Sequence, residues 1–65
     1  MTKDQTDALL WLINEKLLSW EEGVATPVRS DLRALSSLFD LDIPAASARS
    51  FRRRLKAVDA FAIGD

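Results

Sequence analysis

The chain has 65 residues, of which 9 are basic and 10 acidic, and its formal net charge is −1. It contains no His and no Cys, which excludes an imidazole base, a thiolate nucleophile and the usual zinc ligands. Its two glycines, Gly23 and Gly64, lie far apart, so a glycine-rich phosphate-binding loop is excluded as well. Neighbouring carboxylates such as Glu21 and Glu22 lack a partner base. We therefore predict a protein that is not an enzyme and has no metal, cofactor or small-molecule site.

The composition, with 48% hydrophobic and 29% charged residues, is typical of a folded soluble domain. A chain this short buries only about 60% of the surface that its unfolded form exposes, so stability must come from efficient helix packing or from oligomerisation. The longest apolar run, residues 8–13, is far shorter than the roughly 18 residues that span a membrane. The polar N-terminus does not resemble a signal peptide. We expect a cytoplasmic protein without a membrane partner.

Charge is distributed unevenly along the chain. Residues 1–25 carry 2 basic and 5 acidic side chains, whereas residues 44–65 carry 5 basic and 2 acidic ones. The front half is therefore acidic and the back half basic, which makes the molecule dipolar. Such asymmetry suggests an interaction surface without identifying its partner.

A first helix is predicted over about residues 2–22. Thr2 and Gln5 have the spacing of a capping box at its start, and Gly23 supplies the left-handed conformation that commonly ends a helix. One side carries an apolar stripe that we assign to the core, formed by Leu9, Leu10, Ile13, Leu17 and Trp20.

Two further helices are predicted over about residues 27–40 and 44–62. Thr26 followed by Pro27 predicts an N-cap and first helical position, while Asp42 and Ser47 are alternative caps of the last helix, whose start near Pro44 or at Ser47 stays open. Their apolar stripes are Val28, Leu32, Leu35 and Phe39 in one helix, and Ala48, Phe51, Leu55, Val58 and Ala62 in the other. With no competing strand pattern, the fold class is all-α, a compact three-helix bundle forming a single domain over residues 1–65.

The last predicted helix has a basic face opposite its apolar stripe. On a helical wheel most of its cations fall within an arc of about 100°, with Arg54 at the flank. Such a face can follow a phosphate backbone, and serines near the helix start can add hydrogen bonds to phosphate. The predicted DNA-contacting residues are Ser47, Arg49, Ser50, Arg52, Arg53, Arg54 and Lys56. The alternative is a solvated face that only keeps the protein soluble.

Arg29 and Arg33 lie one turn apart on the second predicted helix. They either extend the basic surface or pair with local acids such as Asp31 or Asp40, and we favour the pairing.

The first predicted helix carries a second apolar feature. Trp11 and Leu18, seven residues apart, lie nearly opposite the core stripe. An exposed tryptophan is a candidate interface anchor, and exposed apolar surface on a small domain favours association. We interpret these two residues as an interface, preferably of a homodimer through the first helix. The alternative is that the other two helices wrap this helix on both sides.

Taken together, the segments resemble the helix-turn-helix and winged-helix DNA-binding superfamily. The resemblance depends on residues 9–13 in a first helix, on residues 27–39 in the register of a positioning helix, and on residues 47–60 as a recognition helix. It implies a tri-helical, helix-turn-helix type of bundle without a β-hairpin wing, with core positions at Phe51, Leu55 and Val58. It further implies that Ser47, Arg49, Ser50 and Arg53 face the major groove and that Arg52, Arg54 and Lys56 lie nearer phosphates.

Two functions follow as hypotheses. The first is a small transcriptional regulator of phage, plasmid or bacterial type that binds double-stranded DNA through the basic helix. The second is a helical protein-interaction module, such as an antitoxin, an enzyme inhibitor or an adaptor. It would use Trp11 and Leu18 on the first helix and dock the basic helix on an acidic protein partner.

Overall fold

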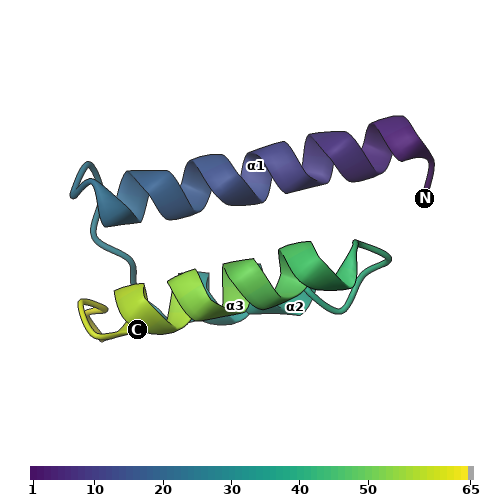
Figure 1. Ribbon diagram of the computed structural model, residues 1–65. Helices are drawn as coiled ribbons and strands as arrows, with labels where there is room; N and C mark the ends of the chain where they lie inside the picture. The colour runs from purple at the N-terminus through teal and green to yellow at the C-terminus, as the bar shows by residue number, and fades with distance from the viewer. Residues whose placement is uncertain (65) are drawn as a thin grey trace.

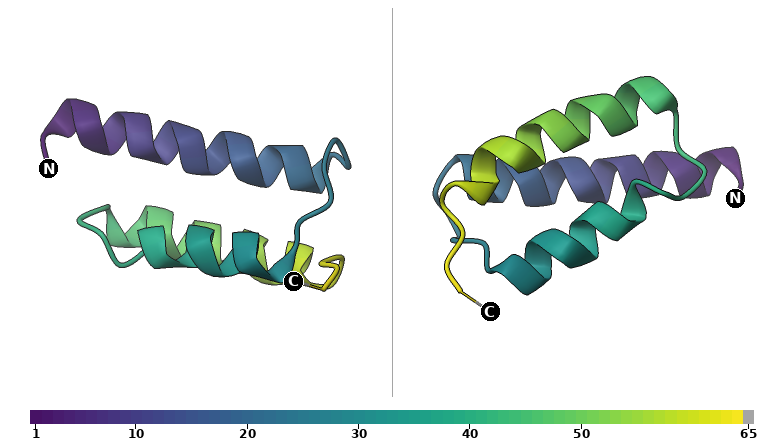
Figure 2. Two further views of the ribbon diagram at one scale, coloured as in Figure 1. Left: turned by 180° about the vertical axis from the view of Figure 1, so that it is seen from behind. Right: turned by 90° about the horizontal axis from the view of Figure 1, so that it is seen from below.

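The computed structural model describes residues 1–64, and Asp65, the last residue of the predicted domain, lies outside them. Its elements are three helices, α1 (Lys3–Glu21), α2 (Arg29–Leu38) and α3 (Ala45–Asp59). α2 and α3 lie side by side and run in opposite directions, and α1 forms a second layer across them (Figures 1 and 2). This arrangement confirms the predicted all-α, three-helix bundle.

α1 has both of its predicted ends. The Thr2 hydroxyl accepts the Gln5 backbone N–H at 3.1 Å, and the Gln5 side chain accepts the Thr2 N–H at 2.8 Å, which completes the capping box. Gly23 adopts a φ of 76°, in the left-handed region. The N–H groups of Gly23 and Val24 then bond to the carbonyls of Trp20 and Ser19, which is the Schellman arrangement that satisfies the last carbonyls of a helix.

The core lies between the two layers. Its residues are the buried members of the three predicted stripes, namely Ile13, Leu17, Trp20, Leu32, Leu35, Phe39, Ala48, Phe51 and Val58. Ile13 and Leu17 are fully buried, and the rings of Phe39 and Phe51 stack with their centroids 6.0 Å apart. Other stripe residues, including Leu9, Leu10 and Leu55, are partly buried against this cluster. The predicted core is thus confirmed.

The predicted start of α2 was wrong by two residues. Val28, in an extended conformation, is the N-cap in place of Thr26, and it has no side-chain capping bond. The cause is the C-terminal tail, because the Ile63 N–H donates to the Pro27 carbonyl at 3.1 Å and Ile63 forms a parallel bridge with Val28. Pro27 is fully buried at this junction instead of opening the helix.

α3 begins at Ala45, with Pro44 at the N-cap position, which decides between the two predicted starts in favour of Pro44. Neither Asp42 nor Ser47 caps it, since no side-chain capping bond is present. The helix ends at Asp59 rather than near residue 62. Its continuation is a tight turn in which the N–H groups of Phe61 and Ala62 bond three residues back, and the tail then turns toward Pro27.

The fully buried Ile13 gives a direct test of the core. We expect Ile13→Ala to lower the free energy of unfolding by about 2–5 kcal/mol, because it removes buried methyl groups and leaves a cavity. Leu12→Ala, at the neighbouring exposed position, is the matched control and should change stability far less. Urea unfolding followed by circular dichroism measures both. Equal losses in the two variants would contradict the packing described here.

Candidate nucleic-acid interface

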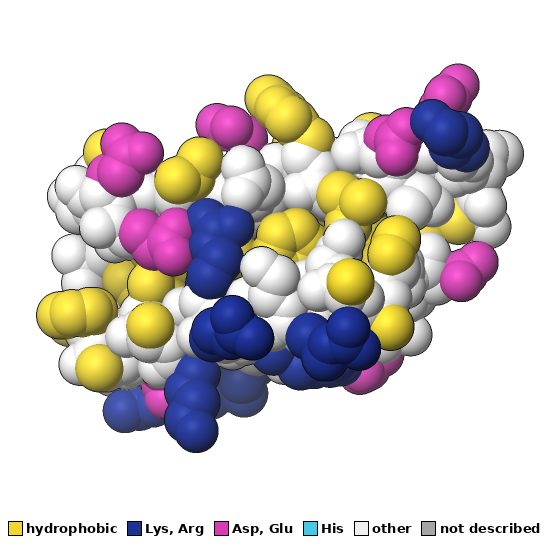
Figure 3. All heavy atoms as spheres, viewed as in Figure 1, with side chains coloured by type: hydrophobic (Ala, Val, Ile, Leu, Met, Phe, Trp, Pro, Cys, Tyr) yellow, Lys and Arg dark blue, Asp and Glu magenta, His cyan; other side chains and the backbone are white. Residues whose placement is uncertain are grey.

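Three cations line the outer side of α3. Arg49, Arg53 and Lys56 are exposed, and their spacing of four and three residues places them in one row facing away from the core. None of the three forms an ion pair within residues 1–64. Figure 3 shows most of the Lys and Arg side chains in view gathered below α1, whose own surface is largely acidic and apolar. We call Arg49, Arg53 and Lys56 the α3 stripe.

The remaining exposed residues around the α3 stripe are small. They are Ala46, Ser50, Ala57 and Ala60. Arg52, at the edge toward α2, is the bulky side chain beside the cations, and the opposite edge carries only small residues. The stripe is accessible to a large, flat or grooved anionic partner as well as to a small one.

Arg52 lies beside the stripe but is tied to the end of α2. Its guanidinium is 3.3 Å from the Asp40 carboxylate and lies over the Phe39 ring at 5.6 Å from the centroid. Half of the side chain remains exposed, and exposed pairs of this kind are weak. Arg52 therefore keeps its charge near the stripe while its position is restrained.

Arg54 has a different environment from the other predicted contact residues. Its guanidinium forms a two-point ion pair with Glu21 at 3.0 and 2.5 Å and donates to the Asn14 side-chain oxygen at 2.7 Å. The side chain is only 24% exposed. Arg54 thus joins α3 to α1, and every guanidinium nitrogen already has a partner.

The ion pair between Arg54 and Glu21, which we call the clamp, changes the pKa values of both residues. Hydrogen bonding from Arg54, reinforced by its charge, holds the pKa of Glu21 below its ordinary value, against the opposing effect of partial burial. The same hydrogen bonding raises the pKa of Arg54. Sequence reasoning missed Glu21 and Asn14. Their spacing of seven residues on one side of α1, together with the position of Arg54 at the flank of α3, was the available signal.

The two serines that we predicted to contact DNA lie in different environments. Ser50 is exposed among the small residues around the α3 stripe, whereas Ser47 is partly buried. Ser47 lies seven residues before Arg54 and therefore on the side of α3 that carries the clamp to α1. At the N-terminal turn of α3 the exposed residues are Ala45 and Ala46, which can contact bases only through apolar groups such as the thymine methyl.

Arg29 pairs with Asp59 of α3 at 3.2 Å, so the favoured pairing with Asp31 or Asp40 was wrong for this residue. A contact between residues thirty positions apart depends on how α2 and α3 pack, which helix spacing alone does not reveal. Asp40 is instead the partner of Arg52.

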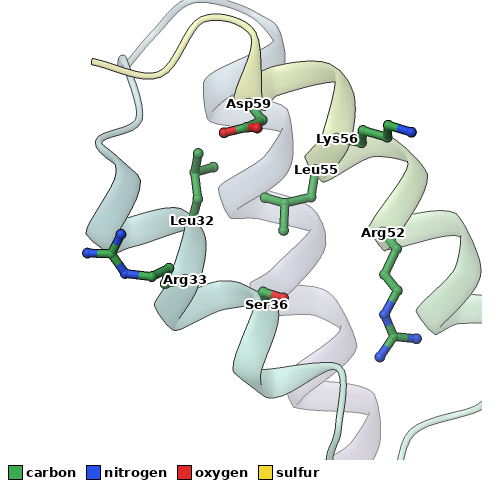
Figure 4. A pocket seen from close by; sticks show the side chains of 7 residues that line it. All are labelled: Leu32, Arg33, Ser36, Arg52, Leu55, Lys56 and Asp59. Atoms are coloured by element: carbon green, nitrogen blue, oxygen red, sulfur yellow. The ribbon is translucent and has the colours of Figure 1, made fainter. Parts of the chain in front are cut away.

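An open groove of about 300 Å³ lies between α2 and α3, on the side away from α1 (Figure 4). Its residues are Leu32, Arg33, Ser36, Arg52, Leu55, Lys56 and Asp59. The two leucines provide an apolar floor, and three of the other residues are cations. Lys56 belongs both to this groove, which we call the α2–α3 groove, and to the α3 stripe.

The outer side of α1 is apolar and acidic. Trp11 is 62% exposed, so it is not wrapped by the other helices, and Leu18 is partly buried. Leu12 is 57% exposed and was missed by the sequence analysis, since it lies away from both predicted stripes. The homodimer through this helix stays a prediction.

Within residues 1–64, none of the helices combines the length and hydropathy needed to cross a membrane. Comparison of the chain with protein-family models, with curated proteins and with solved structures yields no match. Function is therefore inferred from the side chains of this chain alone.

The Glu21–Arg54 clamp predicts a specific pH dependence of stability. Because the folded-state pKa of Glu21 is depressed, its contribution is complete above the ordinary value of 4.5 and is lost as the pH falls through the lower folded value. We expect Glu21→Gln to be less stable than the wild type at pH 7, with the difference shrinking toward pH 3. Urea unfolding across this range measures it. Glu22→Gln is the matched control, and a Glu21→Gln difference independent of pH would contradict the clamp.

Proposed function

We propose that the protein is a small DNA-binding module that contacts double-stranded DNA through the α3 stripe. The observation that carries this proposal is that Arg49, Arg53 and Lys56 form one exposed row with no ion pair within residues 1–64. Such solvent-exposed cations can neutralise phosphates, which releases counterions condensed on the DNA and drives association.

The dimensions of the stripe suit a duplex. Seven residues separate Arg49 from Lys56, which corresponds to about 10 Å along a helix that rises 1.5 Å per residue. The major groove of B-DNA is about 12 Å wide, so cations at the two ends of the stripe can approach opposite walls. The small residues beside them allow the helix backbone to come close. Arg52 adds charge at one edge, whereas Arg54 is held by Glu21 and is left out of the proposed contact.

The proposed contact is mainly to the phosphate backbone. The connection between α2 and α3 runs from residue 39 to residue 44, longer than the three- or four-residue turn of a helix-turn-helix motif. The alanines at the start of α3 offer little base readout. Regulation of transcription would then follow from occupancy of DNA, with any base discrimination supplied by Arg49 and Arg53.

Fluorescence anisotropy with a mixed-sequence duplex, titrated from low to moderate salt, tests this proposal. We expect a dissociation constant of about 10⁻⁶–10⁻⁴ M and a log–log salt slope near −3, because about three phosphates are neutralised. Arg49→Ala combined with Arg53→Ala should weaken binding and reduce the magnitude of the slope by about 2.

The matched control is Lys3→Ala combined with Lys16→Ala, which removes the same charge from α1. It should bind with nearly the wild-type slope. DNA binding by the stripe is disproved if the Arg49, Arg53 variant retains wild-type affinity, or if the wild type does not bind at low salt.

The exposed Trp11 favours a second candidate function, a helical protein-interaction module. Here the outer side of α1 contacts the partner, and Leu12 adds apolar surface to the predicted pair of Trp11 and Leu18. Copurification of tagged protein from its native cells tests it. We expect Trp11→Ala combined with Leu18→Ala to lose a partner that the wild type retains, whereas loss of the same partner from the Arg49, Arg53 variant alone would point to α3 instead.

A further inference from the structure

Two surfaces on opposite sides of the molecule have complementary chemistry. The first is a row along the outer side of α1 in which acidic and apolar residues alternate, namely Asp7, Trp11, Glu15, Leu18 and Glu22. Their spacing of four, four, three and four residues places them within an arc of about 80°. All except Leu18 are exposed, and Leu12 borders the row. We call this row the α1 ridge.

The second surface is the α2–α3 groove. Leu32 and Leu55 form its floor, and the cations Arg33, Arg52 and Lys56 lie at its sides. Arg52 is paired with Asp40, and Lys56 has no ion pair within residues 1–64. Its one acidic residue, Asp59, is already paired with Arg29. Figure 4 shows these side chains around the opening, with the α1 ribbon behind α2 and α3. The groove therefore opens away from the α1 ridge.

We propose that the α1 ridge of one copy docks on the α2–α3 groove of a second copy, with Trp11 over the apolar floor. The groove volume of about 300 Å³ is at the small end of ligand pockets and suits a single aromatic side chain. Glu15, one turn from Trp11, then meets the cations at the side of the groove, whereas Asp7 is already paired with Lys3 and Glu22 lies about 16 Å along the helix from Trp11. Buried tryptophans surrounded by polar pairs are typical anchors of protein interfaces.

Charge favours this head-to-tail contact over a symmetric one between two α1 helices. A symmetric contact would bring Asp7, Glu15 and Glu22 of one copy against the same acids of the other. Because the ridge and the groove point in opposite directions, one docked pair leaves a ridge and a groove unused. Such heterologous contacts propagate into chains or close into rings. The assembly is thus expected to grow with protein concentration.

Sedimentation velocity of the purified protein without DNA tests the proposal. We expect the average mass of the wild type to rise with concentration at low salt and to fall when salt is added, because the contact joins opposite charges. Trp11→Ala should raise the dissociation constant about 30-fold, and Lys56→Glu about tenfold or more. Both changes are at exposed positions, and circular dichroism verifies that each variant keeps its helices.

Mixing the two variants gives the decisive result. Trp11→Ala retains an intact groove and Lys56→Glu retains an intact ridge, so each alone is largely monomeric while the mixture forms dimers and nothing larger. Arg49→Glu is the matched control, since it reverses a charge on α3 outside the groove and should keep wild-type association.

Three outcomes would overturn the proposal. They are a wild type that stays monomeric at all concentrations, a mixture of the two variants that stays monomeric, and association that Trp11→Ala abolishes but Lys56→Glu does not. The last outcome, with association strengthened by salt, identifies a symmetric α1 dimer. Because no DNA is present, failure of this test does not bear on the DNA-binding proposal. Arg49→Glu should weaken DNA binding without changing self-association, so it separates the two contacts.

Discussion

Burial of one side of α1 against both α2 and α3 is the interaction on which the rest of the structure depends. Ile13 and Leu17 are fully buried at the centre of this contact. A chain of this size has one core, and each helix contributes one apolar side to it. The outer sides of α1 and α3 therefore remain uncovered, and the sequence places acids and a tryptophan on one and cations on the other. Both proposed contacts use surfaces that the core leaves exposed.

The ion pairs divide the basic residues of α3 into structural and available ones. Arg54 holds α3 to α1 through Glu21 and Asn14, and Arg52 is restrained by Asp40 and Phe39. Arg49, Arg53 and Lys56 have no ion pair within residues 1–64, although Lys56 also lies at the side of the α2–α3 groove. Helical periodicity alone places Arg54 at the flank but groups Arg52 with the three available cations. Only the packing of α3 between its neighbours separates them.

Short-range sequence patterns correctly predicted the structural features that depend on residues close together in the chain. The capping box at Thr2, the left-handed Gly23 and the three apolar stripes depend on residues within one or two helical turns. The start of α2 was missed because it depends on a bond from Ile63, more than thirty residues away. The pairing of Arg29 with Asp59 and the exposure of Leu12 likewise follow from how the layers pack. The face that carries the α3 stripe could be predicted from sequence, but the restraint of Arg52 by Asp40 and Phe39 could not.

Lys56 connects the two proposals, since it lies in the α3 stripe and at the side of the α2–α3 groove. A duplex on the stripe and a second copy in the groove would both need its charge, so the two contacts would oppose one another. By thermodynamic linkage, the factor by which self-association weakens DNA binding equals the factor by which DNA weakens self-association. Arg49 lies outside the groove and Trp11 lies on the opposite side of the molecule. The two contacts can therefore be altered one at a time. The mutual weakening of DNA binding and self-association through Lys56 can then be measured.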